Sequence, residues 1–173
     1  MELVKPNELT RVFTEVPIWS SQMFGDQKGL NHLAPLLGIL EELGELEEAE
    51  APDLNAFMEE MYDATNDAVG DIGIYTIDFL TRLGIDPVIV WPSRAAEQEH
   101  SALVYLARLN HACLKRHQGI RGFDVDVVFN EAVIDNTAAF LHCINNVYDL
   151  SRGTINTWKN VVSKRNWKAN PDG

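Results

Sequence analysis

Two short acidic segments contain the residues best suited to chemistry. The first, Glu41-Glu42-Leu43-Gly44-Glu45, spaces carboxylates three and four residues apart, so an α-helix would project all three from one side. Like charges at this spacing repel one another, and magnesium is a cation that takes such oxygen ligands. We therefore predict a divalent-cation site on this helix. Because a glycine inside a helix costs about 1 kcal/mol relative to alanine, Gly44 is expected to admit another helix or a ligand.

The second segment repeats the pattern. Asp67 and Asp71 are four residues apart with Gly70 beside them, and Asp78 follows seven residues after Asp71. Aspartate is a poor helix former, yet these residues share one stripe of an apolar helix. Two antiparallel helices joined near Pro52 would turn both acidic stripes toward each other. Helical bundles build carboxylate metal sites in this way, with four or five oxygens around one or two ions.

A solvated acidic surface is the alternative explanation for the first segment. Glu47, Glu48 and Glu50 continue the negative charge toward the end of the same predicted helix, and exposed helix faces are often rich in glutamate. The second acidic segment favours the metal site over this alternative.

The elements that must position these carboxylates are helices. Apolar residues recur at three- and four-residue spacing, and alternation of period two is nearly absent. We expect helices at about 6–24, 31–50, 54–83, 93–117, 130–148 and 155–162, with Asp53 as an N-cap and Pro87–Pro92 as an extended connector. The predicted fold class is all-α, a bundle of about five to six helices. The length of 173 residues suits one domain over 1–173, with a core at 31–84 and C-terminal helices at 93–167.

Charge and composition exclude several classes of partner. The formal net charge of -12 argues against a nucleic-acid polymer and against an anionic membrane. No stretch reaches membrane-spanning length, and the first ten residues lack the apolar core of a signal peptide. The two cysteines are expected to be free, buried thiols, which fits a cytoplasmic protein. The hydrophobic fraction of 46% predicts a buried interface in a homo-oligomer.

With these motifs in place, the chain resembles the all-α NTP pyrophosphohydrolase superfamily, the MazG-like group. That superfamily has an ExxE motif on one helix and an ExxD motif on the next. Glu42 and Glu45 match the first motif, and Asp71 matches the aspartate of the second. The glutamate of ExxD falls at Ala68, so Asp67, one residue earlier, is the expected substitute.

The resemblance implies a hydrolase that cleaves a nucleoside triphosphate to a monophosphate and pyrophosphate, with Mg²⁺, or Mn²⁺ in its place, bridging the phosphates. It also implies a homodimer or homotetramer, because family sites are completed between subunits. The expected roles are metal ligation by Glu42, Glu45, Asp67 and Asp71, water activation by Glu41, second-shell support by Asp78, and phosphate binding by Lys115, Arg121, Lys164 and Arg165. Cations near helix C-termini also complement the helix dipole. This is the alternative role for both groups of basic residues, the one around Lys115 and Arg121 and the one around Lys164 and Arg165.

Recognition of the base is the least defined part of the prediction. Trp19, Phe24 or Trp167 would stack on a base, or each is simply part of the core. His32 precedes the acidic helix and would contact the base or ribose, or serve as a cap or surface residue.

Two other functions compete with the hydrolase. A di-iron carboxylate bundle needs two ExxH pairs among four helices, and the sequence offers one, Glu97 with His100. A helical interaction protein without catalysis would use the acidic surface to bind a basic partner.

Overall fold

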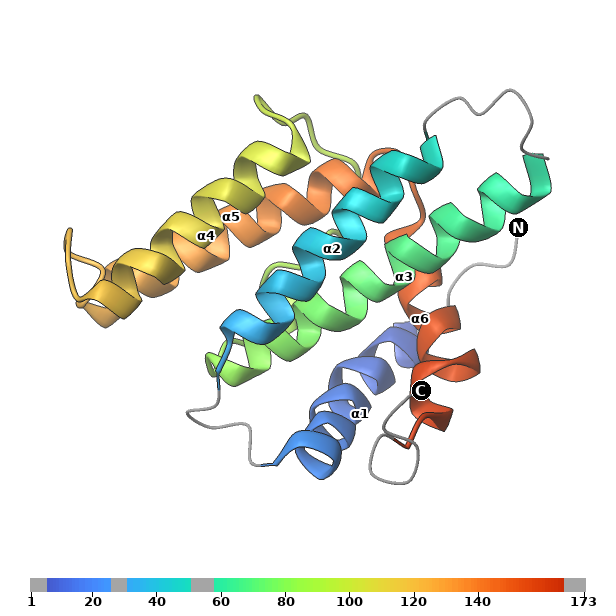
Figure 1. The fold of residues 1–173 in the computed structure, drawn as a ribbon, viewed down its shortest axis with the longest axis horizontal. Coiled ribbons are helices and arrows are strands. Elements are labelled where there is room, and N and C mark those ends of the chain that lie inside the picture. The colour runs from blue at the N-terminus through green and yellow to red at the C-terminus, as the bar shows by residue number, and fades with distance from the viewer. Residues whose placement is uncertain (1–5, 26–30, 51–57, 167–173) are drawn as a thin grey trace. The chain divides into compact units, whose positions relative to one another are not determined.

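The computed structural model describes residues 6–25, 31–50 and 58–166. Within these ranges the chain forms α-helices and two short 3-10 helices, with no strand, which confirms the all-α class (Figure 1). The elements are α1 (Pro6–Phe24), α2 (Leu33–Glu50), α3 (Met58–Arg82), η1 (Pro87–Ile89), α4 (Ala102–Gln118), α5 (Asp126–Asn145), α6 (Leu150–Asn160) and η2 (Val162–Lys164). No helix of the described chain is long and apolar enough to cross a membrane.

The chain divides into two compact units. The first comprises residues 1–84 and 149–173, and therefore holds α1, α2, α3 and α6. The second comprises residues 85–148 and holds α4 and α5. The expectation of one domain over the whole chain stays a prediction.

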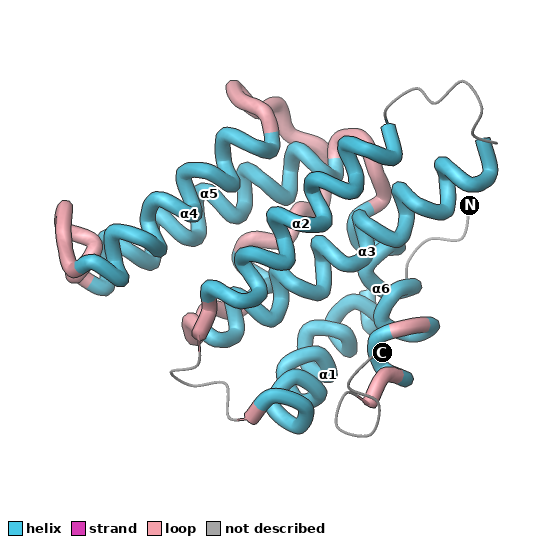
Figure 2. The backbone as a smooth tube through the Cα atoms, in the orientation of Figure 1, coloured by secondary structure: helices cyan, strands magenta, loops and turns pink. Residues whose placement is uncertain are grey.

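In the first unit, α3 is the central element. Helix α2 runs antiparallel along it, α6 packs against it, and α1 contacts both α3 and α6 (Figures 1 and 2). Apolar side chains at helical spacing close the interior. The buried set includes Leu36, Ile39, Leu43 and Leu46 of α2, Ile72, Ile77, Phe79 and Leu80 of α3, and Leu150 and Ile155 of α6.

Glycines on α3 allow α6 to approach closely. A Cβ added to Gly70 would lie 1.9 Å from Thr157 Oγ1, and one added to Gly73 would lie 1.9 Å from Thr154 Oγ1. Neither distance is tolerable for a carbon atom, so the two helices meet where α3 has no side chain. The glycines beside the acidic residues of α3 therefore serve helix packing.

In the second unit, α4 and α5 form an antiparallel hairpin. Gly119 ends α4 in the left-handed conformation, with φ 66°, as the sequence predicts. The Arg116 side chain then holds the turn, because it donates to Phe123 O at 3.0 Å, to Asp124 O at 2.8 Å and to the Asp126 carboxylate at 2.5 Å. Arg116 also lies over the Phe129 ring.

The prediction of a helix from Ser93 is wrong, because α4 begins at Ala102. The side-chain amide of Asn146 binds the backbone of Ala96 on both sides, accepting from its N–H at 3.1 Å and donating to its carbonyl at 2.7 Å. These bonds satisfy the groups that a helix would otherwise use, so residues 93–101 stay irregular.

Two further boundaries differ from the prediction. Helix α5 begins at Asp126 instead of Asn130, although Val127 and Val128 favour extended structure. Helix α6 begins at Leu150 instead of about 155, because the Asp149 side chain caps it by accepting from Arg152 N at 3.0 Å.

Other boundaries agree more closely. Helix α1 is confirmed at 6–24 and runs through Pro17. Helix α2 starts two residues later than expected and ends at Glu50 as predicted. The expected connector at 87–92 opens with η1, where Asp86 accepts from Val88 N at 3.0 Å. The expected helix start near residue 54, the Asp53 cap and Trp167 lie outside the described residues.

Candidate functional site

The facing acidic helices predicted from the sequence lie side by side in the first unit. Close approach of α2 and α3 depends on Gly38, because a Cβ at this position would lie 2.6 Å from Cε1 of Tyr75. The Tyr75 ring therefore rests against the backbone of α2, one helical turn beyond Asp71. This contact was not predicted, since neither residue has a charge or motif that marks it.

Glu42 is the buried carboxylate of the cluster. Only 8% of the residue is exposed, and the pKa of its carboxyl is raised to about 8. Burial is the largest cause, and the negative charges of Asp71, Glu45, Glu41 and Asp67 contribute to the same rise. A buried acid surrounded by like charge is an expensive arrangement, and perturbed acids of this kind gather at functional sites.

Asp71 faces the same region from α3 and is half-buried. Burial raises the pKa of its carboxyl to about 6, and the charges of Asp67 and Glu45 act in the same direction. Arg165, which follows η2, opposes them and lowers the pKa of Asp71. The cluster therefore holds two perturbed carboxyls with a guanidinium within electrostatic reach.

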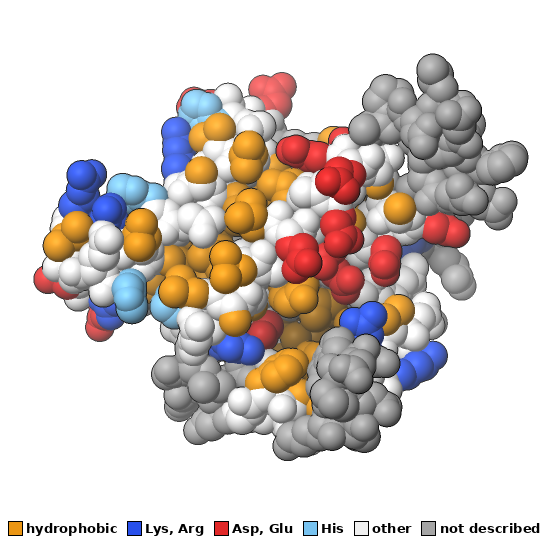
Figure 3. Space-filling model, in the orientation of Figure 1, with side chains coloured by type: hydrophobic (Ala, Val, Ile, Leu, Met, Phe, Trp, Pro, Cys, Tyr) orange, Lys and Arg blue, Asp and Glu red, His pale blue; other side chains and the backbone are white. Residues whose placement is uncertain are grey.

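The other predicted carboxylates lie at the edge of the cluster. Glu41, Glu45 and Asp67 are exposed, and their charges reach Glu42 without being buried with it. Figure 3 shows acidic side chains gathered over α2. Gly44 was expected to admit another helix or a ligand; no helix of the described chain uses this position, because nothing lies within 4 Å of a Cβ built there, and approach of a ligand stays a prediction.

A pocket of about 160 Å³ opens beside the two perturbed carboxyls. Glu42, Asp71 and Arg165 line it. Three aromatic residues line it as well, namely Trp19 and Phe24 of α1 and Tyr75 of α3, and the rings of Trp19 and Phe24 lie edge to face at 5.8 Å. The pocket thus combines aromatic rings, acids and one cation, which gives it both an apolar wall for a ring and polar groups for orientation.

Asp78, predicted to support the metal ligands, also lines the pocket but is bound on other sides. It accepts from Ser20 Oγ at 2.8 Å and forms an ion pair with Arg82 at 2.8 Å. Arg82 in turn donates to Asn31 O at 3.0 Å. This network joins α1, α3 and the segment before α2, so the observed contacts of Asp78 fix the helices that form the pocket. Its second-shell role stays a prediction.

The predicted basic residues divide between the two units. Arg165 and its neighbour Lys164 are both exposed, and of the two only Arg165 lines the pocket. Lys115 and Arg121 belong to the second unit, where the Lys115 ammonium donates to Gln118 at 2.8 Å. Phosphate binding by Lys115, Arg121 and Lys164 therefore stays a prediction.

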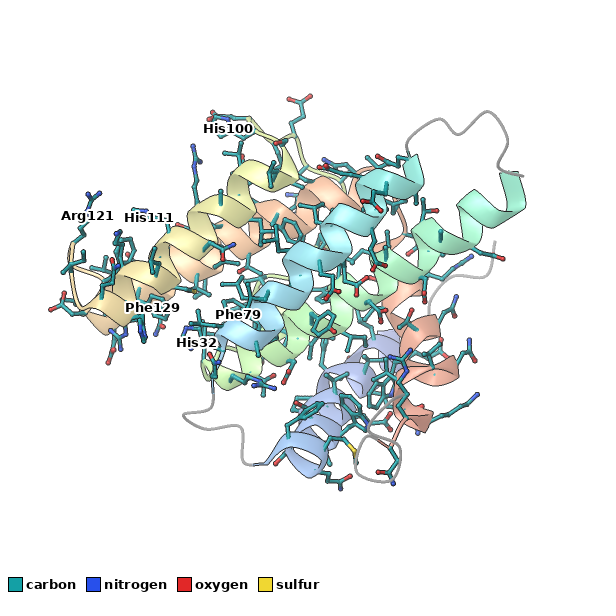
Figure 4. All side chains as sticks on the ribbon, viewed as in Figure 1. His32, Phe79, His100, His111, Arg121 and Phe129 are labelled. Carbon is teal, nitrogen blue, oxygen red and sulfur yellow. The ribbon has the colours of Figure 1, made fainter. Side chains whose placement is uncertain are left out.

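The structure also shows where the residues proposed for a di-iron site and for base recognition lie. Glu97 and His100 lie in the irregular segment before α4 and so do not share a helix face. His32 lies beside Phe79, with ring centroids 6.2 Å apart (Figure 4), and is not among the residues that line the pocket. Both aromatic candidates of α1, Trp19 and Phe24, lie at the pocket.

Among the described residues, no group of three or more His, Cys, Asp or Glu side chains is arranged so as to hold a metal ion as it stands. Comparison with known proteins adds no family: no family model, no curated protein and no solved structure matches the chain. The proposal of a function therefore depends on the geometry and charge of the site.

Proposed function

We propose that this chain is a magnesium-dependent nucleotide pyrophosphohydrolase of the MazG-like type, which cleaves a nucleoside triphosphate or a related nucleotide to the monophosphate and pyrophosphate. The observation that supports it most is the buried carboxyl of Glu42, whose pKa of about 8 reflects burial and four neighbouring acids. A protein tolerates such a cost where the group has a function.

The donor set fits magnesium. Glu42 and Asp71 present hard oxygen ligands from two helices that pack together, and Glu45 and Asp67 stand within electrostatic reach of them. When bound, magnesium would offset these charges, draw in phosphate oxygens and lower the pKa of a water molecule. Manganese prefers the same ligands.

The aromatic wall of the pocket suits a nucleobase. Trp19, Phe24 and Tyr75 supply ring faces and edges, on which a planar base packs favourably. Arg165 is near enough to Asp71 to lower its pKa, and a guanidinium in this place would hold a phosphate group by paired hydrogen bonds. The base would therefore lie against α1, with the phosphates directed toward the acids.

Glu41 is the proposed base that orients and deprotonates the attacking water. Its exposed carboxylate lies one residue before Glu42, at the edge of the cluster. The water oxygen forms a bond to the α-phosphorus, and the water proton passes to Glu41. The bond between that phosphorus and the bridging oxygen breaks, and the oxygen leaves with pyrophosphate. Asp78 serves this reaction by fixing α1 against α3.

The experiment is a product analysis with a panel of ribo- and deoxyribonucleoside triphosphates. We expect monophosphate and pyrophosphate in magnesium, and no turnover when a chelator removes the ion. Glu42→Gln should abolish turnover, while Glu50→Gln, a matched change of an exposed glutamate at the end of α2, should not. Release of orthophosphate would contradict the reaction class, and no turnover of any nucleotide would contradict the enzyme.

We further propose a cytoplasmic homo-oligomer, on the basis of the two free thiols and the exposed apolar side chains of several helices. An interaction protein without catalysis is the alternative. It predicts neither magnesium binding nor pyrophosphate release, so the same assay separates the two functions.

A further inference from the structure

We propose that the turn between α4 and α5 docks on the outer face of α2 in a second copy of this chain, so that two copies form a dimer through two equivalent contacts. The outer face of α2 is defined here by Leu37, Leu40, Gly44 and Glu48. The inference goes beyond the proposed reaction and does not depend on it.

The outer face of α2 exposes apolar surface. Leu37 is 61% exposed and Leu40 is 43% exposed, and at helical spacing they share one stripe with Gly44 and Glu48. Nothing within 4 Å of Gly44 would meet a Cβ. A helix face with large apolar groups beside an open glycine is a surface on which another element can lie flat.

The negative charge of the α2 glutamates is also not balanced by basic residues within the helix. The helix contains six glutamates and neither lysine nor arginine. Glu47, Glu48 and Glu50 occupy its end, where the helix dipole is already negative and basic residues are favoured, and the last turn has none. A cationic partner would therefore stabilise this end of the helix.

The end of α4 and the turn that follows it have more basic than acidic residues, with Lys115, Arg116 and Arg121 against Asp124 and Asp126, and Asp126 pairs with Arg116. Residues 101–123 contain no aspartate or glutamate and four Lys and Arg, in a chain with a net charge of -12. Apolar side chains are exposed around the turn, namely Leu114, Ile120, Val125 and Val128. Figure 3 shows basic and hydrophobic side chains at this end of the hairpin, with histidine and acidic side chains beside them. The surface is thus apolar and basic, the complement of an apolar and acidic helix face.

Arg121 is the residue most clearly prepared for such a contact. Its φ of 60° is in the left-handed region, which costs energy for a residue other than glycine. Arg116 holds the turn that imposes this conformation. The Arg121 side chain is exposed and stands out from the turn (Figure 4). A guanidinium presented in this way binds carboxylates through paired hydrogen bonds.

Both complementary surfaces belong to one chain, so a second copy of the chain is the partner that fits both. In a two-fold dimer, the turn of each copy meets α2 of the other. Each contact joins leucines to apolar residues at the centre and arginine to glutamate at the rim, which is the usual anatomy of an interface.

Reversal of one charge on each surface tests the contact by light scattering coupled to gel filtration. The parent should have at least twice the chain mass of 19.4 kDa at tens of micromolar. Arg121→Glu alone and Glu48→Arg alone should each weaken association about tenfold or more, because each variant places like charges in both contacts.

Mixing the two variants in equal amounts gives the decisive result. A mixed dimer has one reversed pair and one parental pair, so both contacts are restored and the dimer mass should return. The double variant Arg121→Glu with Glu48→Arg should also associate with itself. A monomeric parent, single variants that associate as the parent does, or a mixture that stays monomeric would each overturn the proposal.

Matched controls come from exposed charges outside both surfaces. Arg94→Glu and Glu99→Arg make the same changes of charge in the irregular segment before α4, and both should associate as the parent does. Circular dichroism of each variant establishes that the helices are formed. Loss of association in these controls would show that net charge, and not the proposed contact, governs assembly, and would also overturn the proposal.

Discussion

The two antiparallel helix pairs of this chain differ in whether their charged side chains are exposed or buried. In the α4–α5 pair the interior is apolar, with Leu106, Leu109 and Phe140 buried, and the Arg116–Asp126 ion pair lies at the exposed turn. In the α2–α3 pair a glutamate is buried and faces a second perturbed acid. The first arrangement needs no ligand for its stability. The second is costly without one, which is why we assign the chemistry to α2 and α3.

The largest effect should come from the acids of the α2–α3 pair. Glu42→Gln or Asp71→Asn keeps the shape of the side chain but removes the charge that a magnesium ligand needs. We expect at least about a 100-fold loss of pyrophosphate release, with helical structure intact by circular dichroism. Activity within a few-fold of the parent in both variants would remove these helices from the site.

Two glycine substitutions on α3 and α2 should have opposite effects on the free energy of unfolding. Gly70→Ala should destabilise the chain by about 3 kcal/mol, because its Cβ would lie 1.9 Å from Thr157 Oγ1. Gly44→Ala is the matched control on the open face of α2, and it should stabilise the helix by about 1 kcal/mol. Urea unfolding of the two variants measures both effects. Equal effects would mean that α6 does not pack on α3 as described.

The pH dependence of stability should also distinguish the acidic pair. The folded-state pKa of Glu42, about 8, lies above its ordinary value of 4.5, so the folded chain binds more protons at this site than the unfolded chain between these values. The contribution of Glu42 to stability without metal is therefore fully present below about pH 4.5 and is lost as the pH rises to about 8, by at most roughly 5 kcal/mol. Urea unfolding at fixed pH values in a chelator measures this decline.

The Glu42→Gln substitution and the addition of magnesium test whether Glu42 causes this decline in stability. Glu42→Gln should flatten it, because the variant has no carboxyl to ionise at this position. Magnesium should restore stability near pH 8 in the parent and have less effect in the variant. A parent whose stability rises from pH 5 to pH 8 without metal would contradict the assigned shift.

The smallest effect is expected in the α4–α5 pair. Arg116→Ala removes the bonds to the turn carbonyls and to Asp126, and we expect a loss of about 1 kcal/mol, since the ion pair is largely exposed. Arg94→Ala, a change of an exposed arginine without such bonds, is the control. Hydrogen exchange should show the loss confined to residues around 119–126. Faster exchange at α2 would mean that the turn also supports the acidic pair.

The sequence predicted the parts of this fold that depend on local pattern. Three- and four-residue spacing of apolar side chains predicted the bounds of α1 and α2 to within two residues. The spacing of the charged residues predicted that Glu42 and Asp71 lie in one cluster. The interior or edge position of each acid did not follow from spacing. Glu41 and Glu42 are adjacent in sequence, yet only Glu42 turns toward α3 and is buried.

Features set by distant contacts could not be predicted. Ala95 and Ala96 favour helix, but the Asn146 amide, fifty residues away, holds the backbone of Ala96 instead. Helix α6 begins at Leu150, five residues before the predicted start, where the Asp149 cap and the packing of Gly153 and Thr157 on Gly70 favour the helix. The pocket is likewise lined by α1: Trp19 and Phe24 were candidates for base stacking, but no motif in the sequence indicates that this helix lies beside the acidic pair.

The most direct measurement of the central claim is a calorimetric titration of magnesium into the parent and Glu42→Gln at pH 7, in two buffers with different heats of ionisation. Because the pKa of Glu42 is about 8, most of this carboxyl is protonated at pH 7 and must lose its proton when it binds the ion. We predict binding by the parent with proton release, seen as a heat that differs between the buffers, and a clear loss of both in the variant. No magnesium binding by the parent, or the same binding and proton release in Glu42→Gln, would contradict the account.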